Sequence, residues 1–402
     1  MIIQIAKRIK KIKESPTLAI AAKAQQMKKN GIDVINLSTG EPDFDTPEHI
    51  KAAAIDALRR GFTKYTAVTG TEELKKAIIA KFKRDNNVIY TPDEIIVSSG
   101  GKHVFYNLCM AYLNAGDEVI IPAPYWVSYP DMVLVAQGVS VFIECGIEKK
   151  YKITPEQLKK AITPKTRMLV INSPANPTGA IYSIDELKAI AKILIQHPNI
   201  LIASDDIYEH ILLEKVLIGN LINVEPQLKQ QTILINGVSK TYAMTGWRIG
   251  YAGGPHSLIK AMGIIQSQST SNPCSIAQVA AEVALNASQD CLLPMLDAFK
   301  IRHQLVTQYF NQMQGLKYLP AQGAFYAFVN AEEAIDQLVK QRKIVAKSDI
   351  ALSNYLLDEH QVAVVPGSAF GLEGYFRISF ATNTVLLEKA LDRLKKAFNV
   401  IH

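Results

Sequence analysis

The sequence lacks the features that mark several classes of protein. Its longest apolar runs, such as Leu108–Leu113 and Ala324–Val329, have six residues, whereas a membrane-spanning helix needs about 20. There is no CxxC or HExxH pattern and no histidine spaced to complete a metal site. We therefore expect no membrane partner and no metal. The few cysteines should be reduced residues that pack in the interior: Cys109, Cys145, Cys274 and Cys291.

An excess of one charge is also absent outside the N-terminus. The 402 residues carry a net charge of +7, but residues 1–29 hold eight Lys and Arg against one acid, Glu14, and the remainder is balanced. This basic arm is either a solvated helix face or a site for an acidic partner or polyanion. We expect the helix face and no nucleic-acid partner. Because no apolar stretch typical of a signal peptide follows the cations, we expect a cytoplasmic protein.

Apolar residues make up 48% of the chain, enough for a large core, and the length suggests two or three domains. Apolar runs rich in β-formers alternate with helical patterns such as Lys102–Leu113 and Ile184–Gln196. This alternation predicts an α/β fold with a mostly parallel sheet covered by helices on both faces. The expected strands are Ile95–Ser98, Glu118–Ile121, Val139–Ile143, Met168–Ile171, Ile200–Ser204 and Thr232–Ile235.

The C-terminal part predicts a second, smaller α+β unit. After a possible further strand at Ile249–Ala252, Ser257–Ile265 and Ile276–Phe310 have helical patterns. Short strands then alternate with helices around Lys347–Glu359 and Leu386–Phe398; the strands are Phe325–Val329, Val362–Val365 and Phe376–Ser379. We expect an N-terminal arm and part of the small domain in residues 1–46, a large domain in residues 47–295 and a small domain in residues 296–402.

Five expected strands are followed by residues able to bind a ligand, and ligands of open parallel sheets lie beyond the carboxyl ends of strands. Gly100 and Gly101 precede a helix, where backbone N–H groups can bind phosphate. Trp126 offers a flat ring and Asn176 an amide, and Asp205 and Lys240 offer opposite charges. Each feature also has an ordinary structural explanation when it is taken singly. The two glycines could form a tight turn, Trp126 could pack in the core and Asn176 could belong to a turn. Asp205 could cap a helix, and Lys240 could be a surface lysine.

Their combination favours a cofactor. A phosphate cradle, a stacking ring, a neutral amide, a buried carboxylate and a reactive lysine are the parts needed to hold pyridoxal 5'-phosphate as a Schiff base. At these residues the chain resembles the class I/II (fold type I) aminotransferases, and most closely the bacterial aspartate aminotransferase branch. The resembling motifs run in the family's order: Glu41-Pro42-Asp43-Phe44-Asp45-Thr46-Pro47, Tyr125-Trp126-Val127-Ser128-Tyr129-Pro130, Asn176-Pro177-Thr178-Gly179, Ser239 to Tyr251, and Phe376-Arg377-Ile378-Ser379.

The resemblance implies a role for each cofactor-binding residue. Lys240 matches the lysine that forms the Schiff base and moves the α-proton, and Asp205 matches the acid that faces the pyridine nitrogen. Asn176 and Tyr208 match the pair that binds the ring's phenolic oxygen, and Trp126 matches the stacking ring. The phosphate would meet the backbone amides of Gly100, Gly101 and Lys102, the side chain of Arg248 and, from a neighbouring subunit, Tyr65. Ser239 is a further expected cofactor-binding residue. The large domain would thus bind the cofactor, with active sites shared in a homodimer.

The resemblance also implies a substrate site. Arg377 matches the arginine that grips the α-carboxylate in two-pronged fashion, with Gly40, Trp126 and Asn176 beside it. Lys102 occupies the place of a lysine that holds the distal carboxylate of acidic substrates. We therefore expect a ping-pong transaminase that converts L-aspartate and 2-oxoglutarate into oxaloacetate and L-glutamate. One departure from the family is Asp206, where relatives usually carry Glu; we expect little effect.

Several alternatives remain open within the same fold: an aromatic, prephenate or other amino-acid transaminase, or a pyridoxal-phosphate-dependent lyase. A regulator that senses the cofactor would need a DNA-binding domain before the catalytic body, and about 30 residues are too few for one. A protein that only binds the cofactor is disfavoured because Lys240 and Arg377 serve turnover.

Overall fold

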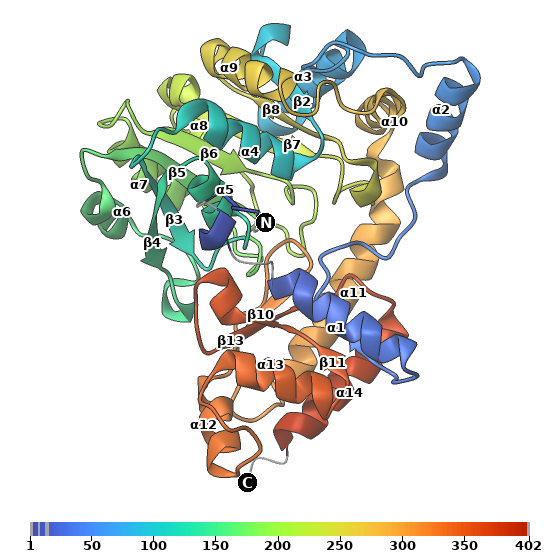
Figure 1. Cartoon of the computed structure of the whole chain (residues 1–402), viewed down its shortest axis with the longest axis vertical. Coiled ribbons are helices and arrows are strands. Elements are labelled where there is room, and N and C mark those ends of the chain that lie inside the picture. Colours follow the sequence, from blue (N-terminus) through green and yellow to red (C-terminus); the bar gives the residue numbers. More distant parts are fainter. Residues whose placement is uncertain (1–2, 7–8, 13–15, 400–402) are drawn as a thin grey trace.

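A seven-stranded sheet forms the centre of the protein in the computed structural model, which describes residues 3–6, 9–12 and 16–399 (Figure 1). Its strand order is β2-β8-β7-β6-β5-β3-β4. All neighbours pair in parallel except β8, which is antiparallel to both β7 and β2. The strands are β2 (Ile95–Ser98), β3 (Glu118–Ala123), β4 (Val139–Glu144), β5 (Thr166–Asn172), β6 (Leu201–Asp205), β7 (Thr232–Gly237) and β8 (Gly250–Gly253).

Helices cover both faces of this sheet because successive strand residues point to opposite sides. Ile96 packs with α4 (Gly101–Tyr112), α5 (Tyr129–Val135) and α9 (His256–Ser267) in one apolar cluster. Ile95 and Val97 face the other side, toward α2 (Glu48–Arg59), α3 (Glu72–Asn86) and α10 (Ser275–Asn286). Further along that side lie α6 (Pro155–Ala161), α7 (Ile184–Leu194) and α8 (Leu221–Val224). The predicted mostly parallel α/β sheet is confirmed.

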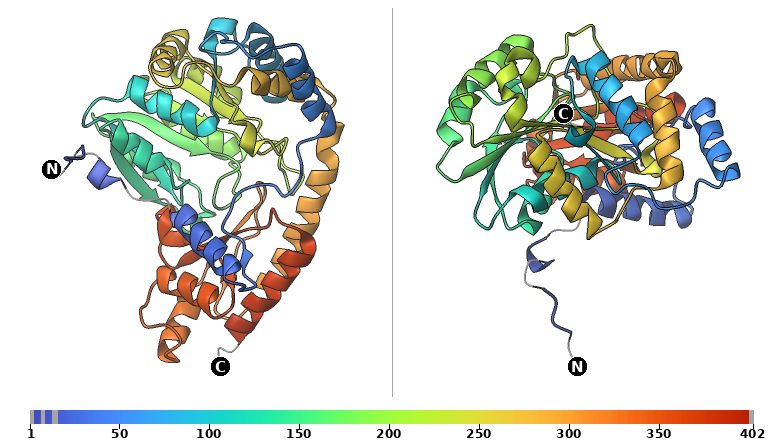
Figure 2. Two further views of the ribbon diagram at one scale, coloured as in Figure 1. Left: turned by 45° about the vertical axis from the view of Figure 1, so that its right-hand side comes forward. Right: turned by 90° about the horizontal axis from the view of Figure 1, so that it is seen from above.

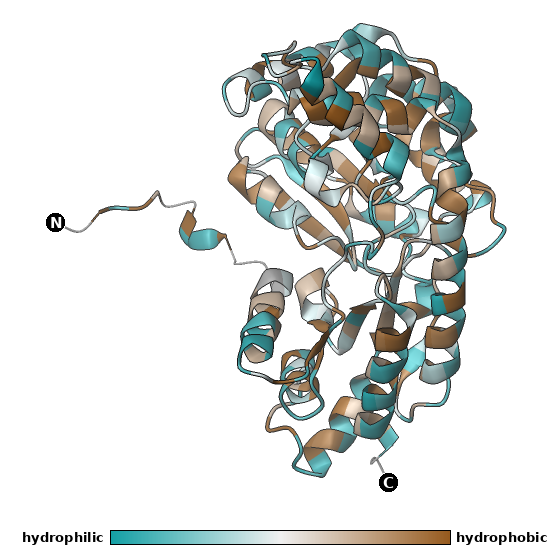
Figure 3. Ribbon diagram, turned by 90° about the vertical axis from the view of Figure 1, so that its right-hand side faces the viewer, coloured by the Kyte–Doolittle hydropathy of each residue, from teal (hydrophilic) through white to brown (hydrophobic). Residues whose placement is uncertain are grey.

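Local sequence explains how individual helices begin and end. Ser183 caps α7 and accepts from the backbone of Glu186, and the buried residues Leu187, Ile190 and Leu194 then recur at helical spacing. The helices consequently show mixed apolar and polar faces (Figure 3). Thr71 caps α3 in the same way, and Asn87 ends it in the left-handed conformation.

The second unit is smaller and mixed, as expected. Its four-stranded antiparallel sheet has the order β12-β13-β10-β9 and packs against α11 (Leu293–Phe310) and α14 (Thr384–Asn399). The other elements of this part are β9 (Lys317–Tyr318), β10 (Tyr326–Asn330), α12 (Glu332–Lys340), α13 (Asp349–Asp358), β12 (Val365–Pro366) and β13 (Tyr375–Ser379). In Figure 2, α11 runs from the large lobe into this unit.

The N-terminal segment joins the C-terminal unit. After α1 (Pro16–Lys29), β1 (Ile35–Asn36) pairs in parallel with β11 (Val362–Ala363). The expected single strand Val362–Val365 is therefore wrong: β11 and β12 belong to different sheets. This pairing is compatible with the proposed division at residues 46 and 295, which stays a prediction.

Two further expectations need correction. The stretch Ile276–Phe310 is not continuous helix, because Ser288 caps a short 3-10 turn and Pro294 then opens α11. Of the cysteines, Cys109 and Cys145 are buried, whereas Cys274 is exposed and does not pack in the interior.

Part of the basic arm, including Lys7, Arg8 and Lys13, lies outside the described residues. No helix of the described ranges is long and apolar enough to cross a membrane.

Candidate active site

A cavity of about 380 Å³ lies at the carboxyl ends of the parallel strands, between the two units. Eleven of the predicted site residues line it: Gly40, Gly101, Lys102, Trp126, Asn176, Asp205, Tyr208, Ser239, Lys240, Arg248 and Arg377. The structure thus brings together residues from position 40 to position 377. Gly100 lies directly beside the cavity, and Tyr65 does not reach it.

Lys240 follows β7 and points its amine into the cavity. Its Nζ donates to the carbonyl oxygen of Gly40 at 2.9 Å. Burial lowers the pKa of Lys240 to about 8, and the nearby Arg248 charge adds to this effect while Glu41 opposes it. The amine therefore loses its proton closer to physiological pH than an ordinary lysine does, as a nucleophile or base requires.

Asp205 is the last residue of β6, and its side chain is buried. The hydroxyl of Tyr129 donates to its Oδ2 at 2.5 Å. Burial raises the pKa of Asp205 to about 6, although the Tyr129 hydrogen bond opposes the shift. Among the described residues no cation forms a salt bridge with this carboxylate, so a positive group of a ligand would be stabilised there.

Arg377 in β13 is buried and held in one orientation. Its guanidinium donates to Oδ1 of Asn176 at 3.0 Å and to the carbonyl oxygen of Ser38 at 2.5 Å. The ring centroid of Tyr326 lies 4.5 Å from the guanidinium carbon. Nε of Arg377 has no hydrogen-bond partner. A buried guanidinium at the wall of a cavity is suited to a carboxylate ligand.

Glycine is required at the turn between β2 and α4. Gly100 has φ +95°, and a Cβ there would lie 2.3 Å from Nη2 of Arg248. The backbone N–H groups at the start of α4 therefore stand beside a guanidinium, at the positive end of a helix dipole. This arrangement can hold a phosphate group.

Trp126 and Lys102 form the adjoining wall. The amine of Lys102 lies 5.3 Å from the ring centroid of Trp126, and the ring meets Tyr129 edge-on at 5.1 Å. Burial lowers the pKa of Lys102, and the charge of Arg248 lowers it further. Lys102 thus lines the same cavity as Arg377, beside Lys240 and Arg248.

Sequence reasoning misses three residues that shape the site. Tyr129 donates a hydrogen bond to Asp205. Tyr326 is hydrogen-bonded to Tyr208, and the hydroxyl oxygens of these two tyrosines lie 2.8 Å apart. Asn172 donates to the carbonyl of Asp205 at 2.7 Å and accepts from the backbone of Asn176 at 2.8 Å. Tyr129 stands inside one of the family-like motifs, and Asn172 directly follows the expected strand Met168–Ile171, whereas Tyr326 has no signal beyond an apolar strand.

Tyr65 lies apart from these residues and is 91% exposed. A large aromatic side chain left in solvent costs apolar surface burial. This exposure is what a residue serving a neighbouring subunit would show in a single chain.

Comparisons with known proteins agree with this geometry. The family model described as aminotransferase class I and II matches residues 32–394. An aspartate/prephenate aminotransferase of Nitrosomonas europaea is 58% identical, over 97% of this chain and 98% of its own. The structure of an aspartate aminotransferase from Rhizobium meliloti superposes with a TM-score of 0.93 at 46% identity, covering 100% of both chains. That of the Thermus thermophilus aspartate aminotransferase with maleate gives 0.91 at 41% identity, covering 98% of this chain and 100% of its own. The chain belongs to the class I and II aminotransferase family.

Proposed function

We propose that the protein is a pyridoxal-phosphate-dependent transaminase that exchanges the amino group between L-aspartate and 2-oxoglutarate by a ping-pong mechanism. The observation that carries this proposal is that the buried amine of Lys240, the buried carboxylate of Asp205 and the guanidinium of Arg377 line one cavity. Oxaloacetate and L-glutamate would be the products.

The residues present fit the cofactor. The turn at Gly100 brings the backbone so close to the Arg248 guanidinium that a Cβ would clash with it, and Asp205 is a buried carboxylate that a protonated ring nitrogen would neutralise. The backbone N–H groups of Gly100, Gly101 and Lys102, together with Ser239 and Arg248, would hold the phosphate, and Trp126 would stack on the ring. Asn176 and Tyr208 would hydrogen-bond the phenolic oxygen.

When bound, pyridoxal phosphate supplies an electron-poor ring that accepts the electron pair of a breaking C–H bond. Asp205 would keep the ring nitrogen protonated. Lys240 would hold the cofactor, and its amine, when free, would take the proton from the substrate α-carbon and return it. Burial lowers the pKa of this amine to about 8, toward the neutral range in which a base exchanges protons efficiently.

A dicarboxylate substrate agrees with the positions of Arg377 and Lys102, two of the four cationic side chains that line the cavity. Arg377 would bind the α-carboxylate, with Gly40, Trp126 and Asn176 around the reacting end, and Lys102 would pair with the distal carboxylate. The Thermus thermophilus neighbour, whose structure contains maleate, a dicarboxylate, supports this assignment, and the names of the relatives support aspartate.

The active form in this proposal is a cytoplasmic homodimer in which each Tyr65 contributes to the phosphate site of the other subunit. Its exposure of 91% in the single chain supports this role. The name of the Nitrosomonas europaea relative raises prephenate as a second amino acceptor.

A transamination panel with aspartate, glutamate, phenylalanine, alanine and prephenate tests the proposal. We expect the highest kcat/KM for aspartate and glutamate and recovery of the matching oxo acids. Preference for phenylalanine would favour the aromatic transaminase, and release of ammonia without an oxo-acid acceptor would favour the lyase. Rapid turnover of prephenate would add that substrate to the same site.

A further inference from the structure

A buried ion pair lies directly behind the segment that carries Asp205 and Tyr208. Glu209 is 7% exposed, and its carboxylate forms a salt bridge with Nζ of Lys81, a residue of α3 whose side chain is fully buried. Burial raises the pKa of Glu209, but the charges of Lys81 and His210 and the hydrogen bonds from Lys81 and Asn86 together outweigh burial, and the pKa lies below its ordinary value. Desolvating two charges is costly, so this pair needs an explanation.

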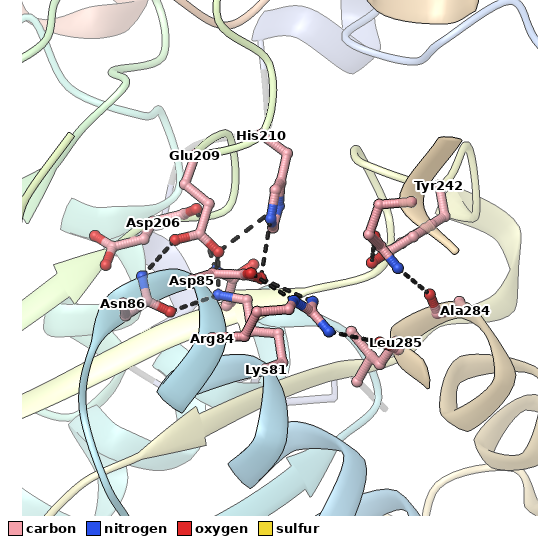
Figure 4. A network of polar contacts seen from close by, with 12 residues as sticks. Lys81, Arg84, Asp85, Asn86, Asp206, Glu209, His210, Tyr242, Ala284 and Leu285 are labelled. Atoms are coloured by element: carbon pink, nitrogen blue, oxygen red, sulfur yellow. Dashed lines mark hydrogen bonds and ion pairs between the residues drawn. The ribbon is translucent and has the colours of Figure 1, made fainter. Parts of the chain in front are cut away.

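The Glu209 carboxylate connects three elements, and Figure 4 shows its contacts with Lys81 and Asn86 of α3. Its Oε2 accepts from Nδ2 of Asn86, the last residue of α3, at 2.5 Å. Its Oε1 accepts from Nδ2 of Asn236, in β7, at 2.7 Å. Lys81 also donates to Oδ1 of Asn86 at 2.7 Å. One carboxylate thus ties the Asp205–Glu209 segment to a covering helix and to the strand that leads to Lys240.

A metal ion is the rival explanation for this cluster. Asp85, Glu209 and His210 offer ligand atoms that lie within 4.8 Å of one another. However, Arg84 donates to both oxygens of Asp85, at 2.6 and 2.9 Å, and Lys81 pairs with Glu209. Since both carboxylates already have protein cations, the cluster is a network of ion pairs.

The segment held by Glu209 has little room to move. The backbone N–H of Asp206 donates to the carbonyl of Ile235 at 2.9 Å, and Asn236 donates to the carbonyl of Asp206 at 3.3 Å. The side chain of Ile207 would lie 3.3 Å from a Cβ at Gly101 and 3.2 Å from one at Gly237. A shift of this segment would therefore move Asp205 and Tyr208 relative to both Lys240 and the phosphate turn.

We propose that Glu209 is a positioning residue which, through Lys81, Asn86 and Asn236, fixes Asp205 and Tyr208 against the cofactor held by Lys240. The inference rests on the proposed function. It gives a role to the charges of Lys81 and Glu209, which contact neither cofactor nor substrate. Small displacements of reacting groups reduce rates strongly. A rigid, fully hydrogen-bonded support would therefore raise the catalytic rate.

The test removes both charges at once, in the variant Lys81→Met/Glu209→Gln, because deleting one partner would leave the other charge buried and alone. The matched control, Lys152→Met/Glu186→Gln, removes an ion pair of the same domain that does not contact the Asp205–Glu209 segment. Purified holoenzymes are compared by the pH midpoint of the visible absorbance of bound pyridoxal phosphate, by cofactor loss on dilution, and by kcat.

We expect the midpoint to rise by about 0.4–1 pH unit, because a displaced Tyr208 loses a hydrogen bond to the phenolic oxygen. Cofactor loss should accelerate and kcat should fall by about tenfold or more at saturating cofactor, while the control stays at wild-type values. A variant with a lower Tm but the wild-type midpoint, cofactor loss and kcat would show a purely structural pair and overturn the proposal.

Asn236→Ala provides a second test that leaves the Lys81–Glu209 pair intact, and it decides the question if the double variant does not fold. It should shift the midpoint in the same direction, and an unchanged midpoint would again contradict the proposal. The proposed function fails separately: a wild-type protein that binds no pyridoxal phosphate and transaminates nothing refutes that function before any variant is compared.

Discussion

The hydroxyl oxygens of Tyr208 and Tyr326 lie 2.8 Å apart, and this contact joins the two units at the site. Tyr208 follows β6, whereas Tyr326 begins β10 and also stacks on Arg377. Tyr326 further explains Gly40, because a Cβ at position 40 would lie 2.1 Å from the Tyr326 hydroxyl. A single side chain therefore contacts groups assigned to the cofactor and to the substrate.

We expect Tyr326→Phe to fold normally and to lower kcat about 2- to 10-fold. The loss of one neutral hydrogen bond costs about 0.5–1.5 kcal/mol, and Tyr208 would then orient less firmly toward the cofactor, while the aromatic packing is retained. Steady-state kinetics with saturating cofactor measure the effect. Tyr151→Phe is the control, because the Tyr151 hydroxyl donates weakly to the carbonyl of Phe328, at 3.4 Å, outside the cavity. Equal losses in both variants would contradict a specific role for Tyr326.

Tyr326 also shows where sequence reasoning ends. Asp205 and Lys240 are predictable because the carboxyl ends of parallel strands converge at one sheet edge. Tyr326 reaches the same cavity from another sheet, and its neighbours Phe325 and Phe328 are equally buried. The residues alone make it one more core aromatic, and only the packing of the two units distinguishes it.

Helix α3 gives a second example. Leu74, Ile78 and Phe82 recur at helical spacing and are buried, a pattern visible in the sequence. Lys81 lies on the same buried face. A lysine in a sequence normally predicts a solvent-exposed position. Its partner Glu209 is 128 residues away in the chain, so no local pattern reveals the pair.

Lys102→Ala should separate acidic from neutral substrates. The loss of a hydrogen bond to a charged group costs about 1.5–3 kcal/mol, so kcat/KM for aspartate should fall about 10- to 150-fold. The value for phenylalanine, which has no distal carboxylate, should change about threefold or less. The exposed Lys260→Ala on α9 is a control for general effects of removing a lysine. Equal losses for aspartate and phenylalanine would show that Lys102 does not read the distal carboxylate.

Asp206 predicts a pH dependence of stability. Burial raises its pKa from 3.8 to about 8, and the nearby Glu209 charge adds to the shift, while Ser204 donates to its Oδ1 at 2.8 Å. Between these two values the folded state binds a proton that the unfolded state has lost. The free energy of unfolding should therefore fall as the pH rises from about 4 to 8, by up to about 1.4 kcal/mol per pH unit.

Asp206→Asn removes the titrating group, so urea unfolding at pH 5 and pH 8 should show a smaller loss of stability than in the wild type. At pH 8 the variant should be the more stable of the two. Asp185→Asn, at an exposed position whose side chain is 93% accessible, should retain the wild-type pH dependence. An Asp206→Asn curve parallel to that of the wild type would mean that Asp206 is ionised in the folded protein.

Mixed dimers test whether Tyr65 acts across a subunit boundary. A chain with Tyr65→Ala keeps its own Lys240, and a chain with Lys240→Ala keeps its own Tyr65; each homodimer should be severely impaired. If Tyr65 serves the neighbouring subunit, the heterodimer contains one complete site, in which the intact Lys240 meets the intact Tyr65 of the other chain. Co-expression with two affinity tags and isolation of the mixed species should then recover about half of the wild-type activity per dimer.

The contrary outcome is equally clear. If Tyr65 acted within its own chain, one site of the heterodimer would lack Tyr65 and the other would lack Lys240, so mixing would restore no activity. The 91% exposure of Tyr65 and its distance from the cavity of its own chain favour recovery.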